Sequence, residues 1–339
     1  MHRVTIKDIA EMAGVSYSSV SRAVNGTGKV SEETKQKILE ICEREGYRAN
    51  TLARNLTQDH TNTIGLIVPS VTNPFYAEIM QQVEIKASEE GYHVLLRPTN
   101  NDDSRTESMI EFLLQQQVDG IILATPQANI VELVNKYSRF VPIVMVAEPG
   151  RNDDISRVNV VSLNNYEGGR IAADYLYSLG HRDIAYVGFR KGNHSQSHRF
   201  QGFTDRLKEE GITPRVIENY GNHSSIESGI RCARQLFESG SVPTAIFSAT
   251  DFTALGVIKA AGECGIRIPE DLSLLGFDNV IYSSLPKIEL STIDHKNDML
   301  SYAAVDTLIH LIHNPDFSEV VHRTIMPVLV CRSSCIAVK

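Results

Sequence analysis

Apolar residues repeat every three or four positions at the start of the chain, which predicts two short helices. The first begins after Thr5, which can cap it and which has the spacing of a capping box with Asp8. Its buried face is expected to consist of four apolar residues: Ile6, Ile9, Ala10 and Ala13. Gly14 supplies a turn, and Ser16 can cap a second helix. That helix directs three apolar residues back toward the first: Val20, Ala23 and Val24.

A third helix is predicted after Ser31, where two glutamates suit the positive end of a helix dipole. Its buried stripe is expected to be Ile38, Leu39, Ile41 and Cys42, and Gly46-Tyr47 ends it. Residues 49–62 are polar, but Leu52 and Leu56 stand four apart, which is compatible with one or two helical turns. A helix this short is marginal alone in water, so we expect it to form only when docked.

From Thr63 onward, short apolar and β-branched runs alternate with amphipathic helical stretches. The predicted strands are Ile64–Val68, Val94–Leu96, Gly120–Ala124, Ile143–Ala147, Val158–Leu163, Ile184–Phe189, Ala245–Ser248 and Leu272–Phe277. Helices between them include Phe75–Glu90, Arg105–Gln117, Glu167–Leu179, Phe200–Glu210, Ser225–Ser239 and Thr253–Cys264. This alternation predicts parallel sheets covered by helices on both faces. Because it restarts near Glu167, we predict two doubly wound lobes, with a ligand cleft at the carboxyl ends of their strands.

The second helix leaves hydroxyl groups and one guanidinium on its outer edge: Tyr17, Ser18, Ser21 and Arg22. A helix-turn-helix presents such groups to base edges and phosphates in the major groove of DNA. For this segment alone, an ordinary hairpin of two helices is the alternative.

The charge distribution separates the first 62 residues from the rest of the chain. The net charge of the whole chain is −8, which alone would argue against a nucleic-acid partner. Residues 1–62, however, carry nine Lys or Arg and eight Asp or Glu, so the acidic excess lies beyond them. Electrostatic affinity for DNA should therefore be modest for one copy, and a dimer would strengthen it.

Length and composition describe an ordinary globular protein. The 339 residues allow two or three domains at about 150 residues each. The N-terminus is charged and lacks the apolar core of a secretory signal, and no apolar run could span a bilayer, so we expect a cytoplasmic protein. Five scattered cysteines fit a reducing compartment, and Cys331 and Cys335 alone make a poor zinc site. We expect neither a metal nor another cofactor.

Several ordered motifs resemble the family of the lac and galactose repressors, the LacI–GalR bacterial transcription regulators, over essentially the full length. Residues 4–25 resemble the helix-turn-helix of that family, and residues 46–56 resemble its hinge. Further motifs are Thr63-Ile-Gly-Leu-Ile-Val-Pro, Asn73-Pro-Phe-Tyr, Asp119-Gly-Ile-Ile, Gly180-His-Arg-Asp-Ile-Ala-Tyr-Val-Gly, Arg199-Phe-Gln-Gly-Phe, Asp251-Phe-Thr-Ala-Leu-Gly, Leu275-Gly-Phe-Asp-Asn and Pro327-Val-Leu-Val-Cys-Arg-Ser-Ser. Ala49 departs from the pattern, because a proline is usual there.

The resemblance implies a fold of two parts, an all-α helix-turn-helix head and an α/β effector domain like a periplasmic binding protein. It places the head at residues 1–48, the hinge helix and linker at 49–62, and the effector and dimerisation domain at 63–339. The first lobe would comprise 63–162 and 292–322, and the second 163–291 and 323–339.

The resemblance also implies how DNA is bound. Two hinge helices of a homodimer would enter the minor groove of a pseudo-palindromic operator, with Leu56 as the wedge at the central base step. Arg22 would make a bidentate contact to guanine, or else a phosphate contact. The full set of implied DNA-binding residues is Thr5, Ser16, Tyr17, Ser18, Ser21, Arg22, Asn25, Lys29, Asn50, Ala53, Arg54 and Leu56.

The cleft is expected to hold a small effector, most simply a sugar or sugar derivative, which would regulate DNA binding allosterically. An aromatic residue would stack on the sugar ring, and charged and amide groups would bind its hydroxyls. The implied effector-binding residues are Asn73, Phe75, Glu148, Arg199, His223, Thr250, Asp251 and Asp278. Asn73 and Asp251 could instead cap the helices that follow them.

Other functions fit the sequence less well. The chain contains no G-x-S-x-G, H-E-x-x-H or Walker motif, and Gly26-Thr-Gly-Lys-Val-Ser suits a loop between helices, so we do not expect an enzyme. A sugar-binding protein of a transport system would carry a signal peptide and no head. Two alternatives stay open: a global regulator with a phosphoprotein co-repressor, and a purine- or nucleoside-responsive repressor.

Overall fold

The computed structural model describes residues 4–25, 28–47, 60–127, 129–219, 221 and 224–338, without the side chain of Asn25. The chain divides into two compact units, Met1–Thr61 and Asn62–Lys339. They are called the head and the sensor unit below.

The head contains three helices, α1 (Ile6–Ala13), α2 (Tyr17–Asn25) and α3 (Glu32–Arg44). The predicted capping box is present: the backbone N–H of Thr5 donates to Asp8 over 2.7 Å, and Asp8 N–H donates to the Thr5 hydroxyl. Gly14 ends α1 at φ +68°, a left-handed conformation that favours glycine. The three helices enclose a small core that includes Ile9, Val20 and Ile38.

The prediction that Leu39 belongs to the core of the head is wrong. Leu39 is 45% exposed, whereas its neighbours Ile38, Ile41 and Cys42 are buried. Successive residues of a helix point about 100° apart, so Leu39 cannot share the face that Ile38 and Cys42 define.

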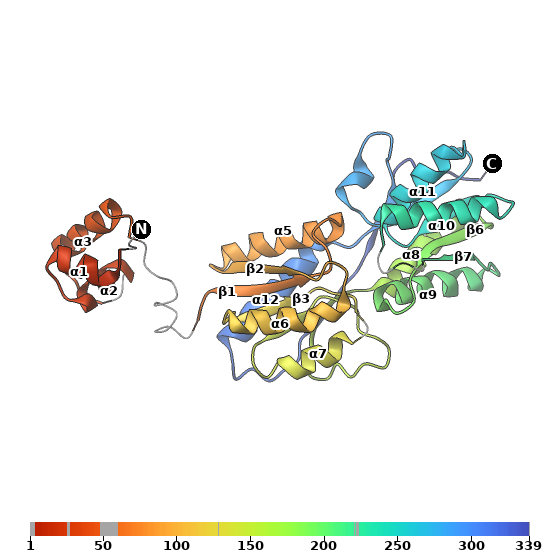
Figure 1. Cartoon of the computed structure of the whole chain (residues 1–339). Helices are drawn as coiled ribbons and strands as arrows, with labels where there is room; N and C mark the ends of the chain where they lie inside the picture. Colours follow the sequence, from red (N-terminus) through yellow and green to blue (C-terminus); the bar gives the residue numbers. More distant parts are fainter. Residues whose placement is uncertain are drawn as a thin grey trace. The chain divides into compact units, whose positions relative to one another are not determined.

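The sensor unit contains two six-stranded sheets. The first has the strand order β11-β5-β4-β3-β1-β2, and all its strand pairs are parallel. The bounds of these strands are β1 (Thr63–Val68), β2 (His93–Pro98), β3 (Gly120–Leu123), β4 (Ile143–Met145), β5 (Asn159–Leu163) and β11 (His322–Ile325). Helices α5 (Pro74–Glu89) and α12 (Asn297–His313) cover one face, and α6 (Thr106–Gln115) and α7 (Ile130–Tyr137) cover the other (Figure 1).

The second sheet has the order β12-β10-β9-β8-β6-β7, and only β12 runs antiparallel to its neighbour among the described pairs. Its strands are β6 (Ile184–Phe189), β7 (Arg215–Glu218), β8 (Ala245–Ser248), β9 (Ser273–Asp278), β10 (Ser291–Asp294) and β12 (Val328–Val330). Helices α8 (Asn165–Ser178) and α9 (His194–Glu209) cover one face, and α10 (Ile226–Glu238) and α11 (Asp251–Glu263) cover the other. Short 3-10 turns lie at Asp103–Arg105 and Ile281–Ser284.

The chain passes between the two sheets three times: after β5, after β10 and after β11. Two of these passages differ slightly from the predicted lobe limits. All of β10, to Asp294, belongs to the second sheet, and β11, to Ile325, belongs to the first, whereas we expected changes at 292 and 323. The two doubly wound parallel-sheet lobes themselves are as predicted.

Glycines allow α8 and α9 to approach closely. A Cβ on Gly169 would lie 2.0 Å from the carbonyl oxygen of Arg199, and one on Gly202 would lie 1.9 Å from that of Tyr166. No residue with a side chain fits at either contact without moving a backbone, so this pair of helices fixes where Arg199 lies.

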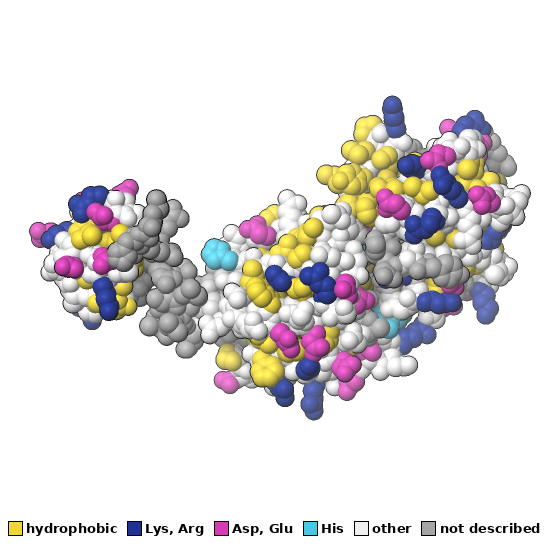
Figure 2. Space-filling model, viewed as in Figure 1, with side chains coloured by type: hydrophobic (Ala, Val, Ile, Leu, Met, Phe, Trp, Pro, Cys, Tyr) yellow, Lys and Arg dark blue, Asp and Glu magenta, His cyan; other side chains and the backbone are white. Residues whose placement is uncertain are grey.

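The surface of the sensor unit mixes acidic and basic side chains (Figure 2). Apolar side chains gather at one place on the second lobe, where Ile281 is 71% exposed and Tyr282 and Leu285 are also exposed. No helix in the described part of the chain has the length and apolar character needed to cross a membrane.

Candidate effector cavity and DNA-facing helix

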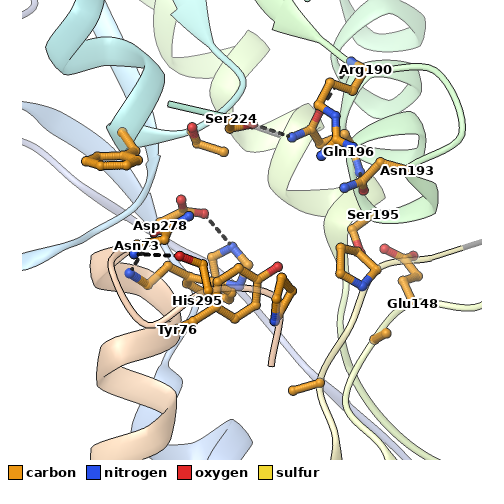
Figure 3. A pocket seen from close by; sticks show the side chains of 18 of the residues that line it. Asn73, Tyr76, Glu148, Arg190, Asn193, Ser195, Gln196, Ser224, Asp278 and His295 are labelled. Atoms are coloured by element: carbon orange, nitrogen blue, oxygen red, sulfur yellow. Dashed lines mark hydrogen bonds and ion pairs between the residues drawn. The ribbon is translucent and has the colours of Figure 1, made fainter. Parts of the chain in front are cut away.

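A cavity of about 550 Å³ lies between the two lobes and takes its lining from both (Figure 3). The first lobe contributes loops that follow β1 and β4 and the end of β5, and the second contributes loops that follow β6 and β8 and the last residue of β9. These are the carboxyl ends of parallel strands, where open α/β sheets bind ligands. The volume lies in the range of small-molecule sites.

Six of the eight residues expected to bind an effector line this cavity: Asn73, Phe75, Glu148, Arg199, Thr250 and Asp278. His223 lies outside the described residues. The structure does not place Asp251 on the cavity. Its carboxylate is fully buried and accepts hydrogen bonds from Val280 N–H, Ser283 Oγ and Thr292 Oγ1 at 2.6–3.0 Å. Asp251 therefore joins α11 to the loop after β9 and to β10.

Arg199 is buried and held on three sides. One terminal nitrogen donates to the carbonyl oxygen of Ala249, the other donates to Asn165 Oδ1 over 2.9 Å, and the guanidinium lies over the ring of Phe277. Its Nε has no hydrogen-bond partner within the described structure. Burial lowers the pKa of Arg199, but Asp278 opposes this change. We expected Arg199 to open its helix, yet α9 starts earlier, at His194.

Asp278 and His295 form a buried pair at the cavity. His295 Nε2 lies 3.0 Å from Asp278 Oδ1, without the alignment of a good hydrogen bond. Burial raises the pKa of Asp278 to about 7, and nearby Arg199 limits the rise. Burial and Arg199 also lower the pKa of His295 well below its usual value, so this ring is neutral at pH 7. Asp278 has φ +121°, an unusual conformation that fits a functional site.

Glu148 follows β4 and reaches toward α9. Its Oε1 lies 2.8 Å from His198 Nδ1, and both side chains are largely buried. Its Oε2 is buried without a hydrogen-bond partner in the described structure, although the residue lines the cavity. Burying such an oxygen is unfavourable, and a donor on a bound molecule would remove that penalty.

Asn73 and Thr250 have structural roles in addition to their place on the cavity. Asn73 Oδ1 accepts from Phe75 N–H over 3.1 Å at the start of α5, and Thr250 Oγ1 accepts from Thr253 N–H over 3.1 Å at the start of α11. The capping alternative is therefore correct for Asn73, and Thr250 rather than Asp251 caps α11.

The sequence analysis missed several residues that line the cavity: Tyr76, Asp103, Arg190, Asn193, Gln196, Ser224 and His295. Asn193 caps α9 by accepting from Gln196 N–H over 2.9 Å, and Gln196 in turn donates to Ser224 over 3.1 Å (Figure 3). The first turns of α9 are polar, so their apolar pattern is weak. An Asn three residues before a Gln was the available sign of a helix start.

In the head, α2 presents the predicted polar edge. Tyr17, Ser18 and Arg22 are exposed, and Ser21 is half-buried. Ser16 accepts from Ser19 N–H over 3.2 Å, which confirms it as a cap, and its hydroxyl also lies 2.8 Å from that of Ser18. Among the other predicted DNA contacts, Lys29 and Thr5 are exposed. The side chain of Asn25, together with Asn50, Ala53, Arg54 and Leu56, lies outside the described residues.

Arg22 lies against Gly28, which has φ +85°. A Cβ at Gly28 would lie 3.2 Å from Arg22 Cδ, closer than an ordinary contact. Gly28 therefore leaves room for the stem of the arginine whose guanidinium we expect to contact DNA.

The described residues contain no group of His, Cys, Asp or Glu side chains that could hold a metal ion. The head presents a polar second helix, and the sensor unit encloses a polar cavity between its two lobes. Together these features define a DNA-binding protein that is controlled by a ligand.

Comparisons with known proteins agree with this class. Residues 5–50 match the family model for bacterial regulatory proteins of the lacI family, and residues 173–335 match a periplasmic binding protein-like domain. The chain is 32% identical to the HTH-type transcriptional repressor PurR of Pasteurella multocida, over 97% of this chain and 98% of that protein. It is 34% identical to the HTH-type transcriptional regulator DegA of Bacillus subtilis, over 86% of each.

Solved structures show the same fold. The lac repressor dimer bound to operator and the anti-inducer ONPF has a TM-score of 0.87 at 27% identity and covers 99% of this chain and 100% of that one. A LacI family regulator from Enterococcus faecium with bound ribose has a TM-score of 0.72 at 25% identity, over 82% of this chain and 100% of that one.

The chain belongs to the lacI family of bacterial regulatory proteins. It is a DNA-binding transcription repressor of the LacI type, and its relatives are regulators rather than enzymes. The predicted fold of a helix-turn-helix head and a periplasmic-binding-protein-like unit is confirmed.

Proposed function

We propose that this chain represses transcription as a homodimer on a pseudo-palindromic operator, and that a small neutral effector, a sugar or sugar derivative, controls its binding. The observation that supports this most is the cavity between the lobes, in which charged, amide and aromatic side chains converge within the sensor unit of a LacI-type regulator.

We propose that α2 reads the operator. Tyr17, Ser18 and Arg22 would contact base edges, with Arg22 bidentate to a guanine, and Lys29 would contact phosphate. The hinge would follow the family pattern, with Leu56 unstacking the central base step at a cost of a few kcal/mol that bending and added contact offset.

The charges around the cavity favour a neutral effector over a phosphorylated one. Arg199 is committed to Ala249 and Asn165, and Asp278 lies in its field. Arg190 lies in the electric field of Asp103. Burial raises the pKa of Asp103, and Arg190 opposes this rise. Each of the two arginines that line the cavity in the described structure therefore already lies near an acidic side chain, which disfavours a phosphate. Carboxylates and amides beside an aromatic ring instead suit vicinal hydroxyls and a sugar face. The ribose in the Enterococcus faecium relative is consistent with this.

The exposed apolar group of Ile281, Tyr282 and Leu285 supports the homodimer (Figure 2). Apolar side chains gathered in one place on a globular surface commonly mark a protein interface. A twofold assembly would also double the modest charge that each head offers to DNA.

A purine or nucleoside is the second candidate effector. Phe75, Tyr76 and Phe252 line the cavity and could stack on a flat heterocycle, while Asn73 and Gln196 could pair with its edge.

The test has two arms. DNA fragments selected from a random pool by the full chain should share an inverted repeat, and failure to enrich any sequence with a confirmed dimer would refute the proposal. A thermal-shift screen of sugars, sugar phosphates, nucleosides and purines should find stabilisation by neutral sugars. Stabilisation by nucleosides alone would select the second candidate, and capture of a phosphoprotein from lysate with no response to small molecules would indicate a protein co-repressor.

A further inference from the structure

The two lobes are joined by side-chain contacts as well as by the three chain passages. The segment 148–151, which follows β4 in the first lobe, lies against α9 of the second lobe. The main contact joins Glu148 Oε1 and His198 Nδ1 over 2.8 Å, and only 15% and 16% of the two side chains are exposed. Because this polar contact is largely shielded from water, it contributes more than the same contact on the surface.

Two more contacts connect the same elements. The guanidinium of Arg151 donates to Gln201 Oε1. At Gly150, a Cβ would lie 2.8 Å from His194 Cε1, so a larger residue there would have to displace the His194 ring. His194, His198 and Gln201 are spaced by four and three residues, which places them on one face of α9.

We propose that this face of α9 and the segment 148–151 form an interlobe clasp, in which His198 positions Glu148 at the cavity and holds the lobes together. His198 occupies Oε1 of the carboxylate, whereas Oε2 is buried, lacks a hydrogen-bond partner in the described structure and belongs to a residue that lines the cavity. A donor on an effector that reached Oε2 would therefore bind the same carboxylate that joins the lobes.

The clasp offers a direct route from ligand to lobe arrangement. A molecule that donates to Oε2 fixes Glu148, and a fixed Glu148 favours the arrangement in which His198 can reach it. The free energy of binding then differs between closed and open lobes, which is the requirement for regulation. This second step rests on the proposed function, since it takes the cavity as the effector site. The clasp itself does not.

The experiment measures lobe separation in the full chain without any effector. Nitroxide labels are placed on cysteines at the exposed positions Ser138 in the first lobe and Lys208 in the second, after Cys264 and Cys331 are replaced by serine. Labelled protein is diluted with unlabelled protein, so that double electron–electron resonance reports distances within one chain only.

His198→Ala should add a longer distance component, with a rise in the open-to-closed ratio of about tenfold, because the close contact of its ring with Glu148 is lost. His198→Asn should largely retain the short distance, because its Nδ2 can take the place of the ring nitrogen. Lys136→Gln breaks an ion pair with Glu107 inside the first lobe, and it should leave the distances unchanged.

An unchanged distribution in a folded His198→Ala protein, judged by circular dichroism and melting temperature, would overturn the clasp. So would equal opening by Lys136→Gln. If the Ala variant does not fold, the same comparison is made with Glu148→Leu. Failure of the sugar proposal would leave these distances as they are, so the two proposals can fail separately.

Discussion

Replacing Arg199 by alanine should both weaken the sensor unit and change how it responds to pH. The side chain is buried and donates to two buried acceptors, the carbonyl oxygen of Ala249 and Asn165 Oδ1. A hydrogen bond to a charged group contributes about 1.5–3 kcal/mol, so losing both should lower the free energy of unfolding by about 3–6 kcal/mol. Removal of the stack on Phe277 adds to this loss.

The second consequence concerns Asp278. Its carboxyl already has a pKa of about 7 because it is buried, and Arg199 holds that value down. Without the arginine the pKa should rise further, and the ionised form should become still less favourable in the folded protein. Arg199→Ala combined with Asp278→Asn should therefore recover part of the stability above pH 7, because the unbalanced charge is gone.

The assay is a double-mutant cycle from urea unfolding at pH 8, followed by fluorescence and circular dichroism, on wild type, both single variants and the double variant. We expect a coupling free energy of about 1–3 kcal/mol between the two positions. Additive losses would refute the electrostatic argument. Retention of the wild-type unfolding midpoint in Arg199→Ala would refute the account of its burial.

Three further predictions concern pH and DNA. Between about pH 4 and 7 the unfolded chain loses the Asp278 proton while the folded chain keeps it. The free energy of unfolding should therefore fall as the pH rises through this range and then level off. Asp278→Asn should remove up to about 1.4 kcal/mol per pH unit of that slope, measured by urea midpoints. Gly28→Ala should disturb Arg22 and relax base preference in binding assays, whereas Gly14→Ala, also at positive φ but with nothing within 4 Å of its Cβ, should affect stability alone. Leu56→Ala should weaken operator binding without altering effector affinity, and equal operator affinity in the variant would contradict the expected role of the hinge. The logarithm of DNA affinity should fall steeply with the logarithm of salt concentration, and a flat dependence would contradict docking through phosphate contacts.

Local patterns predicted the head well because its caps act within three residues. Thr5 with Asp8, and Ser16 before α2, depend only on neighbours in the sequence. The strands buried on both faces, such as β1 and β3, were also evident as apolar runs. The strands β7 and β12 lie at sheet edges and are partly exposed, so their composition resembles that of loops.

The cavity could be anticipated only in part, because its residues meet through the tertiary fold. Arg199 and Asp278 were placed by resemblance to a family, and no spacing in the sequence joins them. His295 and Arg190 lie at the ends of strands far apart in the chain, and nothing local marks them as neighbours of the same cavity. Asp251 was expected at the cavity because it belongs to a motif of the family. Its carboxylate instead accepts hydrogen bonds from Val280, Ser283 and Thr292 within the second lobe.

The three passages between the sheets have a consequence for how the protein is made. Helix α12 supplies much of the apolar layer on one face of the first sheet, and β11 completes its edge, yet both follow almost the whole second lobe in the chain. During synthesis, the early strands of the first lobe must wait with that face covered by α5 but not by α12 until residues 297–325 leave the ribosome. The second lobe is more nearly complete by then, so the part of the sensor unit that begins first should finish folding last.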